Sequence, residues 1–218
     1  MTFSIVGFCE RTESVGIAIS SSSIAVTSRC AWIRNKAGVI ATQNLTNPHL
    51  GPIGLDLLHK GLTSQLVCDA LLAVDKKHHF RQILVLDRTG KCVAYTGNKS
   101  LQYHSHFTGE ACGAAGNLLK NPKTPELMVK EFLNGYQEEL PQRLMNAMFV
   151  GLKSGGEIRE LQSAGLMVTS GDGWVSTNLR IDYSENPLTE LQHLLSHYKP
   201  LEKGYLERVD YPENYQSS

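Results

Sequence analysis

The sequence of 218 residues lacks any apolar run that approaches the roughly 20 residues needed to span a membrane as a helix. Its amino terminus has neither the basic segment nor the apolar stretch of a secretory signal. No run of Lys or Arg exceeds a pair, and the 21 basic residues balance the 21 acidic ones. We therefore expect a soluble cytoplasmic protein with no nucleic-acid partner and no membrane partner.

Motifs for metals and cofactors are also missing. The five cysteines form no CxxC pair, which argues against a zinc ribbon or a disulfide framework and favours reduced, mostly buried thiols. The pairs His78-His79 and His104 with His106 lack the helical i, i+4 spacing and the carboxylate of a zinc protease. Neither a GxGxxG motif after a strand, nor a phosphate loop, nor a GxSxG elbow occurs. We expect no metal and no cofactor.

The pattern of apolar residues predicts sheets joined mainly by hairpins, with helices inserted in pairs. Glycine at position 61 favours a helix end, and Thr63 or Ser64 a helix start. The tail, residues 199–218, carries two prolines without apolar periodicity, so we expect it to be extended or loosely docked to a single domain of residues 1–198. Strands are predicted at 2–8, 15–19, 39–43, 81–86, 91–97, 111–115, 164–169 and 175–182, a turn at 171–173, and helices at 53–58, 63–74, 125–133, 139–152 and 187–198.

Hairpins in this order indicate an α+β fold, because strands that are not joined by crossover helices pair antiparallel. Two such sheets, packed face to face and covered by helices on both outer faces, give a four-layer αββα sandwich. This is the architecture that we expect.

Thr2 stands at the beginning of the first predicted strand. Initiator Met is ordinarily removed before a small residue, and its removal gives Thr2 a free α-amine beside its own hydroxyl. An α-amine has an ordinary pKa of about 7.7–8.0 and can accept the hydroxyl proton near neutral pH. Thr2 is therefore a candidate nucleophile that carries its own base. The alternative is an ordinary strand start.

Several short motifs follow in an order that resembles the bacterial family catalogued as domain of unknown function 1028, a family assigned to the N-terminal-nucleophile hydrolases. The resemblance covers about residues 2 to 198 and implies the αββα fold and an amidohydrolase activity. Its matches include Thr2-Phe3-Ser4-Ile5-Val6, Trp32 with Arg34, Ala41-Thr42-Gln43, Thr46-Asn47-Pro48, Gly51, Gly54-Leu55-Asp56, Arg81-Gln82, Thr96-Gly97, His106 with Gly109, Gly116-Asn117, Gly155-Gly156, Arg159 and Gln162-Ser163-Ala164.

Some positions depart from the family pattern. They include Phe8-Cys9-Glu10 at the end of the first strand, Ser100 with Tyr103 and Ser105, and the acidic pair Glu157 and Glu160. Arg29 occupies a position that is normally apolar. These departures concern the identity of the substrate more than the fold.

The resemblance implies that Thr2 attacks an amide carbonyl and that water later releases the acyl group. A hydrogen-bond donor is then needed where negative charge develops. Asn117 is our candidate, because it follows a glycine at the end of a predicted strand; the alternative is a left-handed turn residue. Gln43 and Asn47 lie where a strand gives way to a helix and are candidates for binding the substrate, although Asn47 also suits the turn before Pro48.

Two further side chains are candidates for substrate binding. Ser21 follows the second strand and could hydrogen-bond the Thr2 amine, or else belong to a polar strand edge. His106 is a candidate donor in the pocket, or else a structural histidine. Arg34 and Arg81 could clamp a carboxylate or form structural ion pairs.

The sequence therefore favours a cofactor-free amidohydrolase that acts on a small linear or cyclic amide. A catalytically silent protein of the same fold, which binds a small ligand or a protein partner, is the second hypothesis. A homo-oligomeric scaffold is the third.

Overall fold

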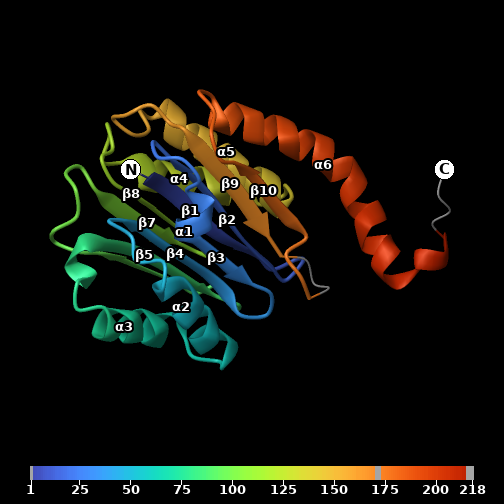
Figure 1. The fold of residues 1–218 in the computed structure, drawn as a ribbon, viewed down its shortest axis with the longest axis horizontal. Helices are drawn as coiled ribbons and strands as arrows, with labels where there is room; N and C mark the ends of the chain where they lie inside the picture. The colour runs from blue at the N-terminus through green and yellow to red at the C-terminus, as the bar shows by residue number, and fades with distance from the viewer. Residues whose placement is uncertain (1, 170–172, 215–218) are drawn as a thin grey trace.

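The computed structural model describes residues 2–169 and 173–214, which form two antiparallel sheets and the helices around them (Figure 1). The six-stranded sheet has the order β10-β9-β2-β1-β8-β7, and the four-stranded sheet has the order β3-β4-β5-β6. The strands are β1 (Thr2–Cys9), β2 (Ser14–Ser21), β3 (Ala31–Arg34), β4 (Gly38–Asn44), β5 (Arg81–Asp87), β6 (Cys92–Thr96), β7 (Ser105–Gly109), β8 (Cys112–Gly116), β9 (Ser163–Val168) and β10 (Thr177–Ile181). The fold is α+β, as the sequence predicts.

Helices cover both outer faces of the paired sheets. Those along the chain are α1 (Thr27–Cys30), α2 (Leu50–His59), α3 (Ser64–Val74), α4 (Thr124–Asn134), α5 (Leu140–Lys153) and α6 (Pro187–Asp210), with short 3-10 turns at His78–Phe80 and Pro212–Asn214. No helix within residues 2–169 and 173–214 is at once long enough and apolar enough to cross a membrane.

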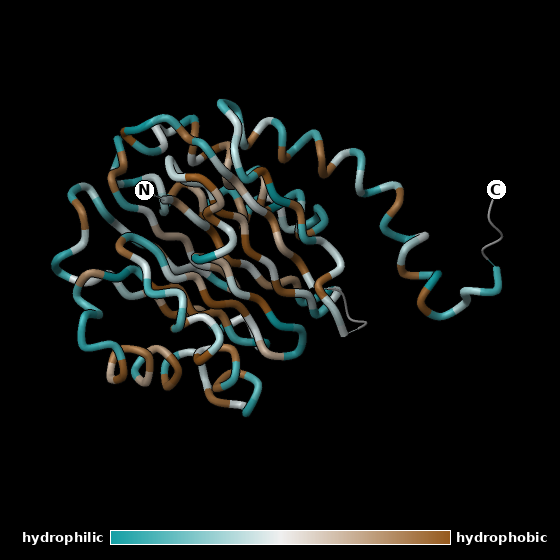
Figure 2. Tube along the Cα trace, viewed as in Figure 1, coloured by the Kyte–Doolittle hydropathy of each residue, from teal (hydrophilic) through white to brown (hydrophobic). Residues whose placement is uncertain are grey.

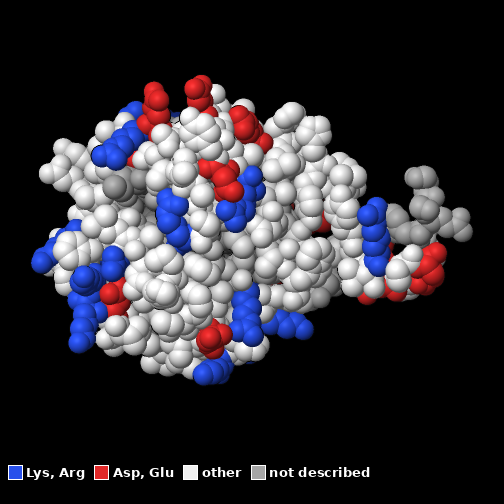
Figure 3. Space-filling model, viewed as in Figure 1, with Lys and Arg blue, Asp and Glu red and all other residues white. Residues whose placement is uncertain are grey.

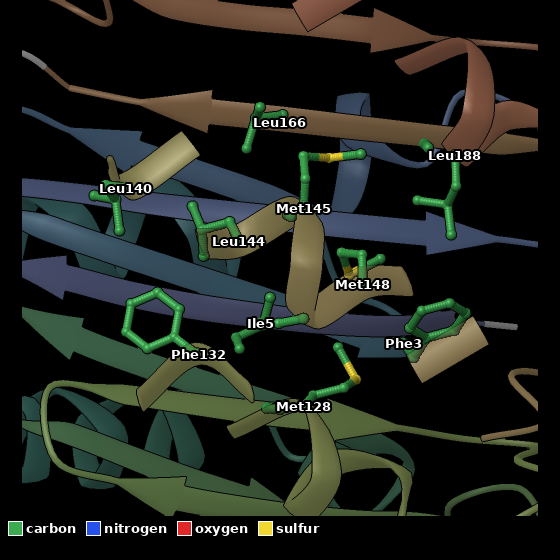
Figure 4. Close-up of a cluster of buried hydrophobic side chains, with 14 of the residues drawn as sticks. Phe3, Ile5, Met128, Phe132, Leu140, Leu144, Met145, Met148, Leu166 and Leu188 are labelled. Atoms are coloured by element: carbon green, nitrogen blue, oxygen red, sulfur yellow. The ribbon is translucent and has the colours of Figure 1, made fainter. Parts of the chain in front are cut away.

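Three clusters of buried side chains lie between successive layers. In the first cluster Phe3 and Ile5 of β1 pack against α4, α5 and the first half of α6 (Figure 4). In the second cluster Val6 meets strands of the other sheet, and in the third cluster β4 and β5 pack against α2 and α3. The apolar residues accordingly concentrate along the strands in the middle of the molecule (Figure 2). Helices, two sheets and helices are thus stacked in that order.

The alternation along β1 decides which side chains face the other sheet. Phe3 and Ile5 face the helices, whereas Val6 faces the four-stranded sheet. Because successive side chains of a strand point to opposite faces, Thr2 and Ser4 face the four-stranded sheet as Val6 does. The beginning of β1 therefore places polar groups between the two sheets.

Several local predictions are confirmed. Gly61 follows the last turn of α2 with φ of +88°, a conformation that glycine adopts without strain. The hydroxyl of Thr63 accepts a hydrogen bond of 3.4 Å from the backbone N–H of Leu66 and so caps α3. The predicted hairpin at 81–97 is formed by β5 and β6.

Other predictions were wrong or incomplete. Strand β7 was not predicted, and neither was the short helix α1. Residues 199–210, expected to be extended or loosely docked, continue α6 without interruption, although Pro200 lies inside the helix. Proline removes one backbone donor and bends a helix, but it does not end this one. Of the predicted turn at 171–173, residues 171 and 172 lie outside the described residues, as do residues 215–218.

Candidate functional site

Thr2 begins β1 and is 4% exposed. Its hydroxyl donates a hydrogen bond of 3.3 Å to Oγ of Ser21, the residue that lies opposite Thr2 on β2. Oγ of Ser21 also lies 2.9 Å from Oγ of Ser23 and accepts a hydrogen bond from the Ser23 backbone N–H. Among the described residues, the hydroxyl of the candidate nucleophile therefore has Ser21 as its hydrogen-bond partner.

Asn117 adjoins Thr2 on the other side, because β8 pairs with β1. Its backbone N–H donates a 3.0 Å hydrogen bond to the carbonyl oxygen of Thr2. Its fully buried side chain donates from Nδ2 to Oε1 of Gln82 at 2.9 Å, while its Oδ1 has no hydrogen-bond partner within residues 2–169 and 173–214. An amide Nδ2 carries two hydrogens, so one donor and one acceptor of Asn117 remain uncommitted.

The alternative interpretation of Asn117 as a left-handed turn residue does not agree with the turn that follows β8. The left-handed conformation belongs to Leu118, with φ of +50°, and Asn117 is not among the residues with positive φ. A left-handed turn therefore does not explain the asparagine at position 117.

A chain of buried side chains extends from Ser4 across the gap between the sheets. The Ser4 hydroxyl donates to Oε1 of Gln43 at 2.6 Å, and Nε2 of Gln43 donates to Oε1 of Gln82 at 3.1 Å. Nε2 of Gln82 donates in turn to the carbonyl of Gly116 at 2.9 Å and to the Thr96 hydroxyl at 3.1 Å. Gln43 is 1% exposed, and its side-chain amide is hydrogen-bonded to Ser4 and Gln82 within the network between the sheets.

His106 joins the same network from β7. Its Nδ1 lies 2.8 Å from the hydroxyl of Thr96, which itself accepts from Gln82. Partial desolvation of the ring, together with the charge of neighbouring His104, lowers the pKa of His106. An imidazole in this state is neutral at physiological pH and can offer either a donor or an acceptor.

Asn47 belongs to a different group of side chains. Its Oδ1 accepts from the backbone N–H of His49 at 3.2 Å, which shapes the turn at Pro48, and its Nδ2 lies 3.4 Å from Asp75. Asp75 also binds Nε of Arg81 at 2.9 Å. The structure therefore brings Gln43, Asn117 and His106 together, whereas Asn47 lies in the cluster around Asp75.

The two arginines that were considered as carboxylate clamps both have acidic partners. Arg81 pairs with Asp75, and the exposed Arg34 pairs with Asp56 at 3.0 Å. Among the described residues, no group of three or more His, Cys, Asp or Glu side chains is arranged to hold a metal ion.

Two residues near Thr2 were missed by sequence reasoning about the site. Gln82 is the centre of the buried network, and a polar residue directly before the apolar run 83–86 of a predicted strand was the available signal. Glu157 is 3% exposed, and its Oε2 accepts from the backbone N–H of Ser22 at 3.1 Å. Since Ser21 lies opposite Thr2, Ser22 lies beyond the beginning of β1, and Glu157 is placed at the α-nitrogen side of Thr2.

The pKa of Glu157 is raised, because burial penalises the carboxylate more than the hydrogen bond from Ser22 favours it. Among the described residues, Thr2 lines none of four cavities of about 420 to 510 Å³, although Thr96 of the buried network lines one of them. The cavity of about 510 Å³ is at the opposite end of β1, beside Cys9. The polar side chains of Thr2, Ser21 and Asn117 are all buried.

Comparison with known proteins identifies the family. The model of a family described as "Family of unknown function (DUF1028)" matches residues 2–191. A crystal structure of a DUF1028 protein from Silicibacter pomeroyi is similar, with a TM-score of 0.84 and 25% identity over 90% of this chain and 85% of that chain. Anbu, the ancestral beta-subunit from Yersinia bercovieri, aligns over 99% of both chains with 12% identity, but its TM-score of 0.39 is too low to carry an argument. No curated protein matches the chain. The chain belongs to the DUF1028 family, as the order of its sequence motifs indicated.

Proposed function

We propose that the protein is an amidohydrolase in which removal of Met1 makes Thr2 the nucleophile for a small amide substrate. While Met1 is attached, the α-nitrogen of Thr2 is an amide and has no basic lone pair. After its removal, the α-amine can take the hydroxyl proton, as in other enzymes that use an N-terminal threonine. The motif resemblance to N-terminal-nucleophile hydrolases supports this assignment by analogy.

The reaction proceeds in two steps. Oγ of Thr2 attacks the substrate carbonyl, the α-amine accepts the hydroxyl proton and delivers it to the leaving amine, and an ester to Thr2 is formed. Water, deprotonated by the same amine, then attacks the ester carbon, and Thr2 is released with a carboxylic acid as the second product. No other reactant is needed.

The observation that carries the proposal is the pairing of Thr2 with Asn117 at the beginning of β1. Asn117 is fixed to the Thr2 carbonyl by its backbone, and its Nδ2 holds one hydrogen that is not committed to Gln82. A buried amide donor on a residue that is hydrogen-bonded to Thr2 through the backbone is suited to stabilise negative charge on the substrate carbonyl oxygen. Gln82 accepts from the Asn117 side chain and holds it in place, and Ser21 accepts from the Thr2 hydroxyl.

Intact-mass analysis of the protein from its native host, combined with labelling by a β-lactone electrophile, tests the proposal. We expect loss of Met1 and one label on Thr2, together with hydrolysis of at least one member of a panel of small amides. Thr2→Ala should abolish both labelling and hydrolysis, a loss of roughly 10³-fold or more, whereas Thr2→Ser should retain the label. Thr108→Ala, on exposed β7, is the matched control.

A mature chain that retains Met1 would lack the α-amine that the mechanism uses as its base and would refute the proposal. A trimmed chain that binds a small amide equally well as wild type and as Thr2→Ala, without turnover, would instead identify a ligand-binding protein of the same fold.

A further inference from the structure

Two histidines lie one turn apart on the exposed side of α6. His193 and His197 have i, i+4 spacing, so their side chains lie one above the other on the same face of the helix. Both side chains are exposed to solvent. The expectation of no metal rested on the pairs His78-His79 and His104 with His106, which lack this spacing, and it overlooked the pair on α6.

The two imidazole rings of the pair turn the same nitrogen toward each other. The Nε2 atoms of His193 and His197 are 3.1 Å apart, and the ring centroids are separated by 4.5 Å. Imidazole nitrogens bind Zn²⁺ at about 2.0–2.1 Å, so two of them at neighbouring corners of a tetrahedron or a square are about 2.9–3.4 Å apart. The observed distance lies within this range.

The contact between the two nitrogens is also chemically open to a metal ion. As a hydrogen bond, it requires that one Nε2 carries a proton and donates it to the lone pair of the other. A divalent ion can take the place of that single proton and accept both lone pairs. Each ring then carries its proton on Nδ1, where water can accept it.

The helix holds the two rings in this arrangement. Leu188, Leu191 and Leu195 of α6 are at most 2% exposed and pack on the six-stranded sheet. Leu195 lies two positions from each histidine and therefore points to the opposite side of the helix. Because the turn that carries both histidines is anchored from behind, they lose little freedom when they bind one ion together.

The surroundings of the pair suit a transition metal. No Asp, Glu, Lys or Arg lies between Glu190 and Lys199, and the ammonium of Lys199 is bound to Glu139 and Glu202 at 2.6 and 2.7 Å. In Figure 3 the middle of α6 shows uncharged surface, whereas charges of both signs appear at its projecting end. Nitrogen ligands without a carboxylate favour Cu²⁺, Ni²⁺ and Zn²⁺ over Mg²⁺ and Ca²⁺.

The pair lacks the further groups of a catalytic zinc site. The spacing from His193 to His197 is that of the two histidines in the HExxH motif, but Leu194 occupies the place of its general base. Among the described residues, no third His, Cys, Asp or Glu completes a set of ligands. The arrangement therefore suits binding of an ion and not metal-assisted hydrolysis.

We propose that His193 and His197 form a bidentate site for one divalent transition-metal ion. Both Nε2 atoms bind the ion, and water occupies its remaining positions. Cu²⁺ binds more tightly than Ni²⁺ or Zn²⁺, in the general order of affinities of nitrogen sites. The site is on the outside of α6 and does not depend on the chemistry proposed for Thr2.

Isothermal titration calorimetry of the untagged full-length protein with Ni²⁺ tests the proposal. We expect one tightly bound Ni²⁺ per chain. His193→Ala and His197→Ala should each weaken binding roughly 10²-fold, because a single ligand loses the high effective concentration of the second. His59→Ala removes an exposed histidine from α2 and is the matched control, which should keep the wild-type affinity.

An exchange of two positions separates chelation from the number of exposed imidazoles. His193→Ser together with Ser196→His keeps the composition of α6, but it makes the two histidines neighbours whose side chains point about 100° apart. We expect this variant to bind Ni²⁺ as weakly as His193→Ala. Electron paramagnetic resonance with Cu²⁺ should detect two coordinated imidazole nitrogens in the wild type and one in His193→Ala.

A wild type that binds Ni²⁺ no more tightly than His193→Ala overturns the proposal. So does an exchange variant that keeps the wild-type affinity, since any exposed histidine would then suffice. Circular dichroism checks that each variant is folded, as is expected for replacements at exposed positions. If His193→Ala fails to fold, His193→Gln replaces it with the same expected result.

Discussion

The side-chain amide of Asn117 donates a 2.9 Å hydrogen bond to Oε1 of Gln82, and this bond joins the six-stranded sheet to the four-stranded one. Gln43 donates to the same oxygen. Nε2 of Gln82 faces the backbone carbonyls of Ser105 and Gly116, which can only accept, so the orientation of the Gln82 amide is fixed. The donors of Asn117 and Gln43 are oriented as a consequence.

Replacement of Gln82 should therefore destabilise the protein. Gln82→Leu leaves the buried donors of Gln43 and Asn117 without an acceptor, and we expect the free energy of unfolding to fall by about 3 kcal/mol, since each unsatisfied buried group costs about 1–3 kcal/mol. Urea denaturation measures this loss. Gln102→Leu, at an exposed position, should change the value by no more than about 0.5 kcal/mol.

A double-mutant cycle isolates the bond itself. Gln82→Ala and Asn117→Ala should show a coupling free energy of about 1 kcal/mol, because the second replacement removes a group that the first has already left unpaired. Additive effects of the two replacements in urea denaturation would contradict the role that we assign to this bond.

The sequence predicts features that depend on neighbours in the chain and misses those that depend on packing. The cap at Thr63 and the glycine at position 61 are local signals, and both were recognised. The bond between Asn117 and Gln82 joins residues 35 positions apart on different sheets, and no spacing along the chain reveals it. The helical conformation of residues 199–210 was missed because Pro200 indicates a helix end, whereas packing of the preceding turns on the sheet and ion pairs of Lys199 support the helix through it.

The ion pair between Asp75 and Arg81 should make stability depend on acid pH. Burial opposes ionisation of Asp75, but hydrogen bonds from Arg81, the Lys77 backbone and Asn47 outweigh it and hold the pKa of Asp75 below its ordinary value. The unfolded chain therefore binds this proton at a higher pH than the folded protein does. The stabilisation is complete above the unfolded pKa of about 3.9 and is lost as the pH falls through the folded pKa.

Asp75→Asn should lower the free energy of unfolding by about 2 kcal/mol at neutral pH, the value of a hydrogen bond to a charged group. Urea denaturation should show this difference shrinking as the pH falls below about 4. Asp56→Asn breaks the exposed pair with Arg34 and is expected to cost no more than about 0.5 kcal/mol. Equal losses for the two variants would show that burial of the Asp75 pair has no effect.

Gly51 allows α2 to approach β3 closely. A Cβ atom at this position would lie 2.2 Å from the ring of Trp32, so the indole or the helix must move. We expect Gly51→Ala to destabilise the protein by about 1–3 kcal/mol in urea denaturation, the usual range for overpacking. Ile53→Ala, at an exposed position of the same helix, is the control and should cost less. If Gly51→Ala leaves the free energy of unfolding unchanged, the ring of Trp32 moves aside without cost.

Glu157 should make stability depend on pH in the direction opposite to that of Asp75, because its pKa is raised and not lowered. Burial raises the pKa of its carboxyl group, so the folded protein binds this proton more tightly than the unfolded chain does. The stability contributed by Glu157 is therefore greatest below its ordinary pKa of about 4.3 and falls as the pH rises through the raised folded value. Glutamine has the same shape, can still accept from Ser22, and carries no charge at any pH.

Glu157→Gln should consequently raise the melting temperature at about pH 7.5, and the gain should vanish near about pH 4, where wild-type Glu157 is itself protonated. Thermal denaturation of both proteins across this range measures the difference. Glu160→Gln, at an exposed position three residues further on, should show no such trend. A Glu157→Gln protein that melts below wild type at neutral pH would instead indicate that the carboxylate is stabilised by a cation at the beginning of β1, the place where the free α-amine of Thr2 would be formed.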